Sequence, residues 1–215
     1  MNEIVELLRL PSPAPKPQAL AFDGERLWMG SIETSRLYAI DPQQWKVWEE
    51  SAVPGKPWGM TAVGDELRVI CGVTAEDDRV IRRFVPGHGF KDREAIACPD
   101  NTGSHLSYDG THLYVSQWYN RRILELDERG APVREVASPH QICGHTFVDG
   151  VFYVISTEDE KTTDYWLTRI DPRGGTAAAE DLARVPFRAR ALAFDGERFW
   201  TNHREQNETV AFTLP

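Results

Sequence analysis

The 215-residue chain repeats one short pattern five times, and this repetition limits the folds open to it more than any other feature. The pattern is an apolar residue, any residue, Asp-Gly, two further residues, an apolar residue and an aromatic residue, as in QALAFDGERLW and RALAFDGERFW near the two ends. Its glycines are Gly24, Gly64, Gly110, Gly150 and Gly196. Their successive spacings of 40, 46, 40 and 46 residues average 43. A nearly fixed period of this size indicates a repeat architecture.

Each copy of the pattern predicts a β-hairpin. Asp-Gly between two alternating apolar segments favours a type I′ turn, which needs positive φ at both central residues. The second copy departs from the others, with Val63 before its glycine and Asp65 after it. A third strand follows every hairpin, and a fourth follows the first four hairpins. Four short antiparallel strands in about 40–45 residues are typical of a propeller blade, whereas a β-sandwich is the alternative.

The lengths of the two chain ends favour a closed ring over a sandwich. The 19 residues after Gly196 and the 24 residues up to Gly24 together make 43, which is one mean repeat. The N-terminal segment EIVELLRLP therefore supplies the outer strand that the last blade lacks, which also removes an exposed sheet edge. We predict an all-β, five-bladed propeller that forms one domain over residues 1–215. The expected blades are 18–55, 56–101, 102–141, 142–187, and 188–215 completed by 1–12.

Composition excludes several classes of partner. The net charge of −9 argues against nucleic acid, because a phosphate backbone requires a basic surface. No run of about 20 apolar residues that could span a membrane is present. The start, MNEIVELLRLPSP, has acidic residues where a signal peptide has basic ones, and the three widely spaced cysteines do not resemble a disulfide framework. We expect a cytoplasmic monomer.

The segments LAFDGERLWMGSIETSRLYAIDP and LSYDGTHLYVSQWYNRRILELD resemble the repeats of the NHL, SMP-30/gluconolactonase and YncE-like propeller superfamily. The resemblance covers the whole chain and implies a propeller whose function ranges over lactonases, lyases, glutaminyl cyclotransferases and non-catalytic scaffolds. Lactonase-like members hold calcium with acidic and amide side chains on the inner strands, but the equivalent positions here are not acidic. Another class of propeller lyases holds zinc with three histidines around the channel.

Alignment of the repeats identifies candidate site residues, because equivalent positions form rings around the channel. The first inner-strand positions are Ala19, Gly59, His105, His145 and Ala191. The ring late in the second strands contains Ser31, Cys71, Gln117, Ser156 and His203. We predict that His105, His145 and His203 converge on one channel mouth. They would suit a divalent transition metal such as zinc with an open coordination position. The alternative is that each histidine is satisfied separately by backbone carbonyls or water.

Other residues of this mouth complete the predicted site. His105 and His145 are candidate acid–base groups and Arg190 a candidate electrophile, so these three form the predicted catalytic set. A structural salt bridge from Arg190 to Glu205 or Glu33 is the alternative. The remaining predicted ligand-binding residues are cationic, aromatic or amide-bearing: Arg188, Lys56, Trp58, Trp118, Gln117 and His140.

Two further features are read as structural. Cys143 next to His145 could be a nucleophile, but a buried cysteine is the more common explanation. The loop TEDEKTTD, residues 157–164, is predicted to be solvated polar surface.

A cationic mouth on an acidic chain predicts a site for a small anionic molecule or peptide. A metal-assisted lyase or hydrolase reaction at this mouth is one hypothesis. A non-catalytic surface for a protein or peptide is the other. Convergent histidines in a deep pocket would favour the first hypothesis, and a shallow face with separately satisfied histidines would favour the second.

Overall fold

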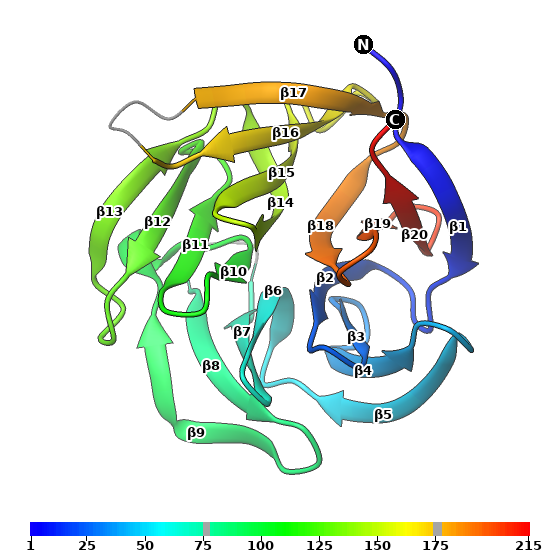
Figure 1. The fold of residues 1–215 in the computed structure, drawn as a ribbon. Coiled ribbons are helices and arrows are strands. Elements are labelled where there is room, and N and C mark those ends of the chain that lie inside the picture. Colours follow the sequence, from blue (N-terminus) through cyan, green and yellow to red (C-terminus); the bar gives the residue numbers. More distant parts are fainter. Residues whose placement is uncertain (75–77, 174–177) are drawn as a thin grey trace.

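The computed structural model describes residues 1–74, 78–173 and 178–215. Five four-stranded antiparallel sheets surround a central axis (Figure 1), which confirms the predicted five-bladed propeller. Blade one contains β2 (Pro17–Phe22), β3 (Leu27–Ser31), β4 (Arg36–Asp41) and β5 (Lys46–Ala52). Blade two contains β6 (Lys56–Val63), β7 (Glu66–Gly72), β8 (Val80–Val85) and β9 (Gly89–Ala97). Blade three contains β10 (Leu106–Tyr108), β11 (Leu113–Gln117), β12 (Arg122–Leu126) and β13 (Pro132–Ala137), and a short 3-10 helix (Pro99–Asn101) precedes it.

The remaining two blades close the ring. Blade four contains β14 (Gln141–Val148), β15 (Val151–Thr157), β16 (Tyr165–Asp171) and β17 (Ala178–Val185). Blade five contains β18 (Ala189–Phe194), β19 (Phe199–His203), β20 (Glu208–Thr213) and the N-terminal β1 (Val5–Pro11). β1 pairs with β20 from Val5 opposite Thr213 to Pro11 opposite Glu208, as predicted for the closing strand. Among the described residues, no helix is long and apolar enough to cross a membrane.

The Asp-Gly hairpins differ from the predicted turn type in three of the four blades that carry this sequence. Asp149 and Gly150 both have positive φ, at 50° and 84°, as a type I′ turn requires. At Gly24, Gly110 and Gly196 the glycine has positive φ but the preceding aspartate does not. These three turns are longer, because the aspartate carboxylate accepts backbone N–H groups two and three residues later. The carboxylate thus replaces the tight backbone turn.

The same aspartates hold the aromatic residues of the second strands. Asp23 accepts a hydrogen bond from Trp28 Nε1 at 2.6 Å, and Asp195 accepts one from Trp200 Nε1 at 2.7 Å. Both indoles are fully buried and pack in the core between neighbouring blades. Burial alone would raise the pKa of the Asp195 carboxyl, but hydrogen bonds from Trp200 and Arg198 hold it below its ordinary value. Each turn is therefore fixed to the blade core by one carboxylate.

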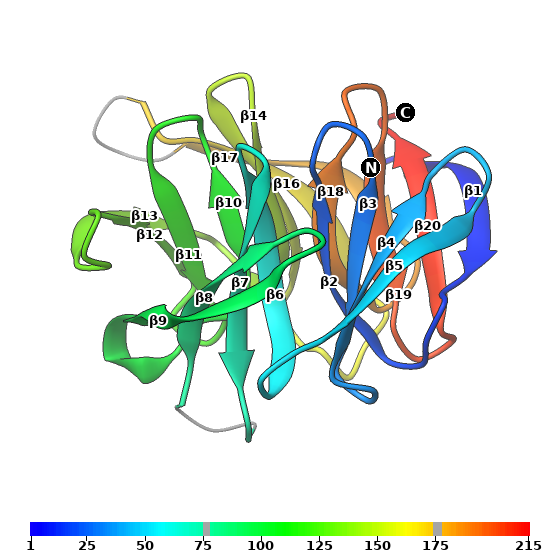
Figure 2. The same ribbon diagram turned by 90° about the horizontal axis from the view of Figure 1, so that it is seen from below.

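Figure 2 shows these hairpins on one face of the ring, and the inner strands approach one another closely towards the other face. A Cβ atom on Gly59 would lie 2.5 Å from the Cα atom of His105, and one on Gly144 would lie 2.3 Å from the carbonyl carbon of Ala191. Only glycine fits at these two contacts. They bring neighbouring inner strands together where the candidate site residues enter the channel.

Replacing Asp195 by asparagine tests the role of this carboxylate. Asparagine has one acceptor oxygen, so its NH2 group would face either the buried Trp200 N–H group or the N–H groups of the turn, and D195N should lower the free energy of unfolding by about 1–3 kcal/mol. Asp149→Asn is the matched control, because among the described residues no hydrogen bond reaches the Asp149 carboxylate and asparagine tolerates positive φ. Urea denaturation measures both variants. Equal stability losses in the two variants would contradict this assignment.

Candidate functional site

One pocket of about 220 Å³ gathers residues from all five blades. It lies where the inner strands begin and the second strands end. Its lining includes three arginines, three aromatic side chains, one histidine and one carboxylate: Arg79, Arg190, Arg204, Trp58, Trp118, Tyr119, His105 and Glu160. This composition combines the predicted cations, tryptophans and one of the predicted histidines in a single cavity.

β-Bulges in the inner strands shape this pocket. In β2, Pro17 pairs with Ser31 and Ala19 with Gly30, so Gln18 is the extra residue. In β6, Trp58 is the extra residue in the same way. β14 and β18 also change register at this end. Bulges redirect side chains at functional sites, and both Gln18 and Trp58 line the pocket.

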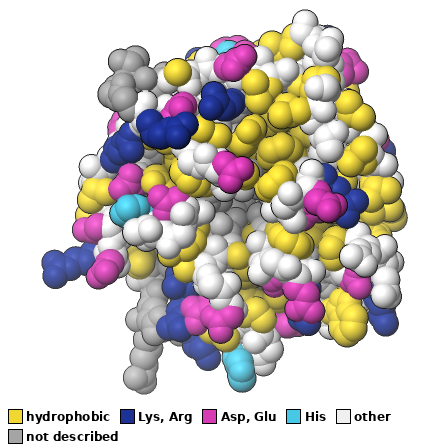
Figure 3. Space-filling model, viewed as in Figure 1, with side chains coloured by type: hydrophobic (Ala, Val, Ile, Leu, Met, Phe, Trp, Pro, Cys, Tyr) yellow, Lys and Arg dark blue, Asp and Glu magenta, His cyan; other side chains and the backbone are white. Residues whose placement is uncertain are grey.

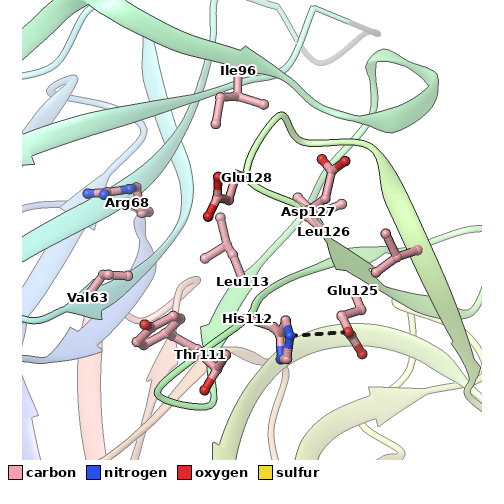
Figure 4. A pocket seen from close by; sticks show the side chains of 12 residues that line it. Val63, Arg68, Ile96, Thr111, His112, Leu113, Glu125, Leu126, Asp127 and Glu128 are labelled. Atoms are coloured by element: carbon pink, nitrogen blue, oxygen red, sulfur yellow. Dashed lines mark ion pairs between the residues drawn. The ribbon is translucent and has the colours of Figure 1, made fainter.

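A larger cavity of about 600 Å³ lies elsewhere, between blades two and three (Figure 4). Two of its charged or titratable side chains already have partners: His112 lies 3.8 Å from Glu125, which also lines the cavity, and Arg68 pairs with Glu66 beside it. None of the predicted site residues lines it. The ring face in Figure 3 shows basic side chains near acidic ones and a broad area of hydrophobic side chains. We therefore place the candidate site in the smaller pocket.

Arg204 is the unusual cation of this pocket. Its Nη1 donates to Gln18 Oε1 at 2.7 Å, and no carboxylate of the described residues forms an ion pair with it. Burial and the neighbouring Arg190 charge lower the pKa of the guanidinium, while Glu160 and Glu205 partly oppose this shift. A half-buried guanidinium without an ion pair favours the arrival of an external anion.

Arg190 is almost completely buried, with 3% of its surface exposed. It donates to Tyr165 Oη at 2.9 Å and to Glu160 Oε2 at 3.2 Å, and its Cζ atom lies 4.6 Å from the Trp118 ring centre. The salt bridge expected as the alternative thus exists, but with Glu160 instead of Glu205 or Glu33. Its Nε atom is buried without a hydrogen-bond partner among the described residues. Arg190 is a fixed cation in the pocket wall.

Arg188 lies outside the pocket lining. It donates to Glu205 at 2.8 Å and to the carbonyl oxygens of Lys161 and Thr162. These bonds hold the loop between β15 and β16. The structure therefore gives Arg188 a role in loop attachment and does not bring it together with Arg190 in the cavity.

The two tryptophans each stack against an arginine. Arg79 Cζ lies 3.9 Å from the Trp58 ring centre, and Arg79 also pairs with Asp78 at 3.3 Å. Trp118 Nε1 donates to Gln141 Oε1 at 2.9 Å, whereas Trp58 Nε1 is buried without a partner among the described residues. Both tryptophans line the pocket, as the sequence predicted for a wall.

His105 and His145 are buried and neutral at neutral pH. Burial lowers the pKa of His105 well below its ordinary value, and His145, Arg190 and Arg204 add to this effect. Burial lowers the pKa of His145 to about 4, although the His105 backbone opposes part of the shift. His105 Nε2 and both ring nitrogens of His145 lack a well-aligned hydrogen bond within the described part of the chain. His105 lines the pocket and His145 does not.

His203 does not join the other two histidines. Its Nδ1 atom lies 3.5 Å from Glu208 and 3.3 Å from Arg9 Nη1, and its ring packs on Phe187. Within residues 1–74, 78–173 and 178–215, no group of three His, Cys, Asp or Glu side chains is arranged to hold a metal ion. The predicted three-histidine set does not form in the described chain. The donor set therefore does not fit the predicted zinc.

Gln117 and Lys56 also lie outside the pocket lining. Gln117 Nε2 donates to Pro99 O at 2.9 Å, while Gln117 Oε1 accepts from Arg122 at 2.6 Å. These bonds hold the segment before blade three. Lys56 lies at the start of β6, opposite Gly72.

His140 and Cys143 do not line the pocket, because His140 contacts two carboxylates elsewhere and Cys143 lies in the core. His140 lies between Glu158 Oε1, at 2.6 Å, and Asp181 Oδ2, at 3.2 Å, and stacks on Trp166. Cys143 is fully buried, and burial raises the pKa of its thiol to about 12. A thiol held neutral in this way fits the interpretation of Cys143 as a buried core residue.

Three residues that line the pocket are not among the site residues predicted from the sequence. Arg204 directly follows His203 of the ring late in the second strands, so the sequence indicates its position. The sequence does not indicate that Arg204 lacks an ion pair. Arg79 precedes the third strand of blade two, which the ring alignment did not cover. Glu160 belongs to the loop predicted to be solvated surface, but its carboxylate contacts a buried arginine. Only the folded chain places these three side chains together.

Comparisons with known proteins show the fold. No protein-family model and no curated protein matches the chain. Solved structures that do match include regucalcin, a calcium-binding protein from Agrobacterium tumefaciens, with a TM-score of 0.61 and 11% identity over 100% of this chain and 96% of that one. A catalytically inactive virginiamycin B lyase from Staphylococcus aureus with quinupristin has a TM-score of 0.57 and 15% identity over 95% and 72%.

Hydrazine synthase from Kuenenia stuttgartiensis matches with a TM-score of 0.58 and 18% identity over 90% of this chain, which spans 64% of that protein. The five-bladed ring agrees with the propeller fold that the resemblance of the repeats implied. At these identities the likeness concerns the fold alone.

The buried histidines predict a loss of stability in mild acid. The pKa of His145 is about 4 in the folded chain, below the ordinary value of about 6.5 of an unfolded chain. The unfolded state therefore binds more protons between these values. The contribution of His145 to the free energy of unfolding is fully present above pH about 6.5. This contribution falls by about 3 kcal/mol as the pH is lowered to 4.

Urea denaturation between pH 4 and 7.5 measures this slope. His145→Asn should make the slope shallower, whereas His88→Asn, on an exposed turn, should leave it unchanged. An unchanged slope in the His145 variant would show that this histidine is not buried in its neutral form.

Proposed function

We propose that the pocket lined by Arg190, Arg204, Trp58 and Trp118 binds a small anionic molecule. The observation that carries this proposal is Arg204, a half-buried guanidinium with no ion pair among the described residues, next to the buried Arg190. Two neighbouring guanidinium groups repel each other in a medium of low polarity. A bound carboxylate or phosphate would relieve this repulsion and accept hydrogen bonds from Arg204.

Unpartnered polar atoms support the same proposal. Trp58 Nε1, Arg190 Nε and His105 Nε2 are buried without hydrogen-bond partners among the described residues, and all three residues line the pocket. Buried polar groups are usually paired, so each exception requires an explanation. Two of these atoms are donors, and the neutral imidazole nitrogen of His105 can donate or accept. A ligand rich in acceptor atoms suits this set.

The size and walls of the pocket support a small ligand over a protein surface. The volume of about 220 Å³ lies below the range of about 300–1,000 Å³ typical of sites for drug-sized ligands. The nearly buried side chains of Arg190 and His105 lie in its wall, as expected for a cavity that encloses its ligand. The alternative of a protein or peptide partner would require the ligand to contact this cavity through one anionic side chain or terminus.

A lyase or hydrolase reaction is the second candidate function, and His105 is the observation in its favour. Its unpartnered Nε2 atom belongs to the same pocket as the two guanidiniums. A neutral imidazole can accept a proton from a bound substrate, while Arg190 or Arg204 stabilises a developing oxyanion. The low pKa of His105 weakens it as a base, which favours binding as the primary function. The solved neighbours include both a calcium-binding protein and a lyase, so the fold accommodates both roles.

Binding of small carboxylates and inorganic phosphate tests the proposal. Isothermal titration calorimetry at low ionic strength should detect binding to the wild-type protein, and Arg204→Gln should weaken it by about tenfold or more, as expected for a lost hydrogen bond to a charged group. Affinity should also fall as salt screens the interaction.

Arg121→Gln is the matched control for this experiment. Arg121 is an exposed arginine paired with Glu158 and does not line the pocket, so its loss should leave affinity unchanged. Equal weakening in the two variants would mean that general surface charge, not the pocket, attracts the anion. Absence of any binding at millimolar concentrations would reject the proposed function.

A further inference from the structure

Two of the three arginines that line the pocket form ion pairs with carboxylates, and among the described residues the third does not. Arg79 pairs with Asp78 at 3.3 Å, and Arg190 pairs with Glu160 at 3.2 Å. Arg204 is the remaining arginine of the lining, and it has no ion pair among the described residues. One positive charge of the described wall is therefore left without a carboxylate partner.

Glu160 covers Arg190 on the solvent side. Its side chain is 45% exposed, whereas the Arg190 side chain is 4% exposed. Both residues line the same pocket, so a ligand that enters meets the carboxylate as well as the guanidiniums. Glu160 thus occupies a position at which a second ligand carboxylate would otherwise contact Arg190.

The loop that carries Glu160 is attached at several points. Arg188, which directly precedes the inner strand β18 that carries Arg190, donates to the carbonyl oxygens of Lys161 and Thr162. Tyr165 Oη donates to the carbonyl oxygen of Glu160 at 3.4 Å and accepts from Arg190. These bonds hold the backbone beside Glu160 against blade five. The attached loop therefore keeps Glu160 beside Arg190, which its carboxylate contacts at 3.2 Å.

We infer that Glu160 is a specificity-determining residue that makes the pocket select small monoanions over dianions. The inference rests on the proposed function. Arg204 accepts one anionic group, while Glu160 neutralises Arg190 and repels a second anionic group in the same small cavity. Repulsion between like charges disfavours a competing ligand, so it adds to the specificity that contacts with the correct ligand provide. The ligand class is a small molecule with a single negative charge.

The test compares two ligands that share a carbon chain and differ by one charge. Monomethyl succinate carries one carboxylate at neutral pH and succinate carries two. Calorimetry at pH 7.5 should show tighter binding of monomethyl succinate by the wild-type protein. Glu160→Gln should shift the affinity ratio towards succinate by about tenfold or more, because it removes the repulsion and frees Arg190.

Glu158→Gln is the matched control. Glu158 lies in the same loop, pairs with His140 and Arg121, and does not line the pocket. It loses the same charge, so an equal shift in this variant would overturn the inference in favour of general electrostatics. Glu160→Asp keeps the charge and should retain the preference for the monoanion. Thermal unfolding of each variant verifies that it is folded.

The possible outcomes separate the inference from the function on which it rests. If Arg204→Gln abolishes binding of both ligands but Glu160→Gln leaves their ratio unchanged, the anion site stands and the role of Glu160 is rejected. A wild-type preference for succinate also rejects it. If neither ligand binds the wild-type protein at millimolar concentrations, both the proposed function and the selectivity are rejected.

Discussion

Pairing between β1 and β20 is the interaction on which the rest of the molecule depends. It joins Val5 to Thr213 and Pro11 to Glu208, and so fixes the last blade to the first segment of the chain. Without a closed ring, the starts of the five inner strands would not surround one point. The pocket takes residues from all five blades, from Gln18 in blade one to Arg204 in blade five, so its existence follows from this closure.

Much of the architecture could be predicted from the sequence because it is repeated. The Asp-Gly spacing and the length of the two ends were sufficient for the number of blades and for the role of the N-terminal strand. The turn type was predicted less well, because a carboxylate that bonds backbone N–H groups competes with the type I′ backbone at Asp23, Asp109 and Asp195. The Asp-Gly dipeptide occurs in both turn types, so it cannot distinguish the type I′ turn from the longer turn held by the aspartate carboxylate.

The site could be predicted only in part. Ring alignment placed His105, Arg190, Trp58 and Trp118 at one mouth, and these four do line one pocket. It could not show the β-bulges that shift the register beside Gln18 and Trp58, because a bulge depends on the pairing of two strands. Nor could it show the partner of each charge. Whether an arginine is paired depends on loops far apart in sequence, such as the loop with Glu160 and the strand with Arg190.

The proposed site depends on a balance between burial and charge. The described wall has three guanidiniums and one lining carboxylate, on a chain whose net charge is −9. Such a local reversal attracts an anion that the rest of the surface repels. The buried histidines do not contribute to this positive charge, because burial lowers their pKa and keeps them neutral. The selectivity assigned to Glu160 follows from the same balance.

The most direct measurement is a crystal structure of the protein grown with sodium bromide, with data collected at the bromine absorption edge. Bromide is a monoanion whose position is identified by its anomalous scattering. The proposed site predicts that the strongest anomalous peak lies in the pocket, within contact of the Arg204 guanidinium and between Trp58 and Trp118. Bromide bound only at exposed lysines and arginines of the outer surface, with none in the pocket, would contradict the account.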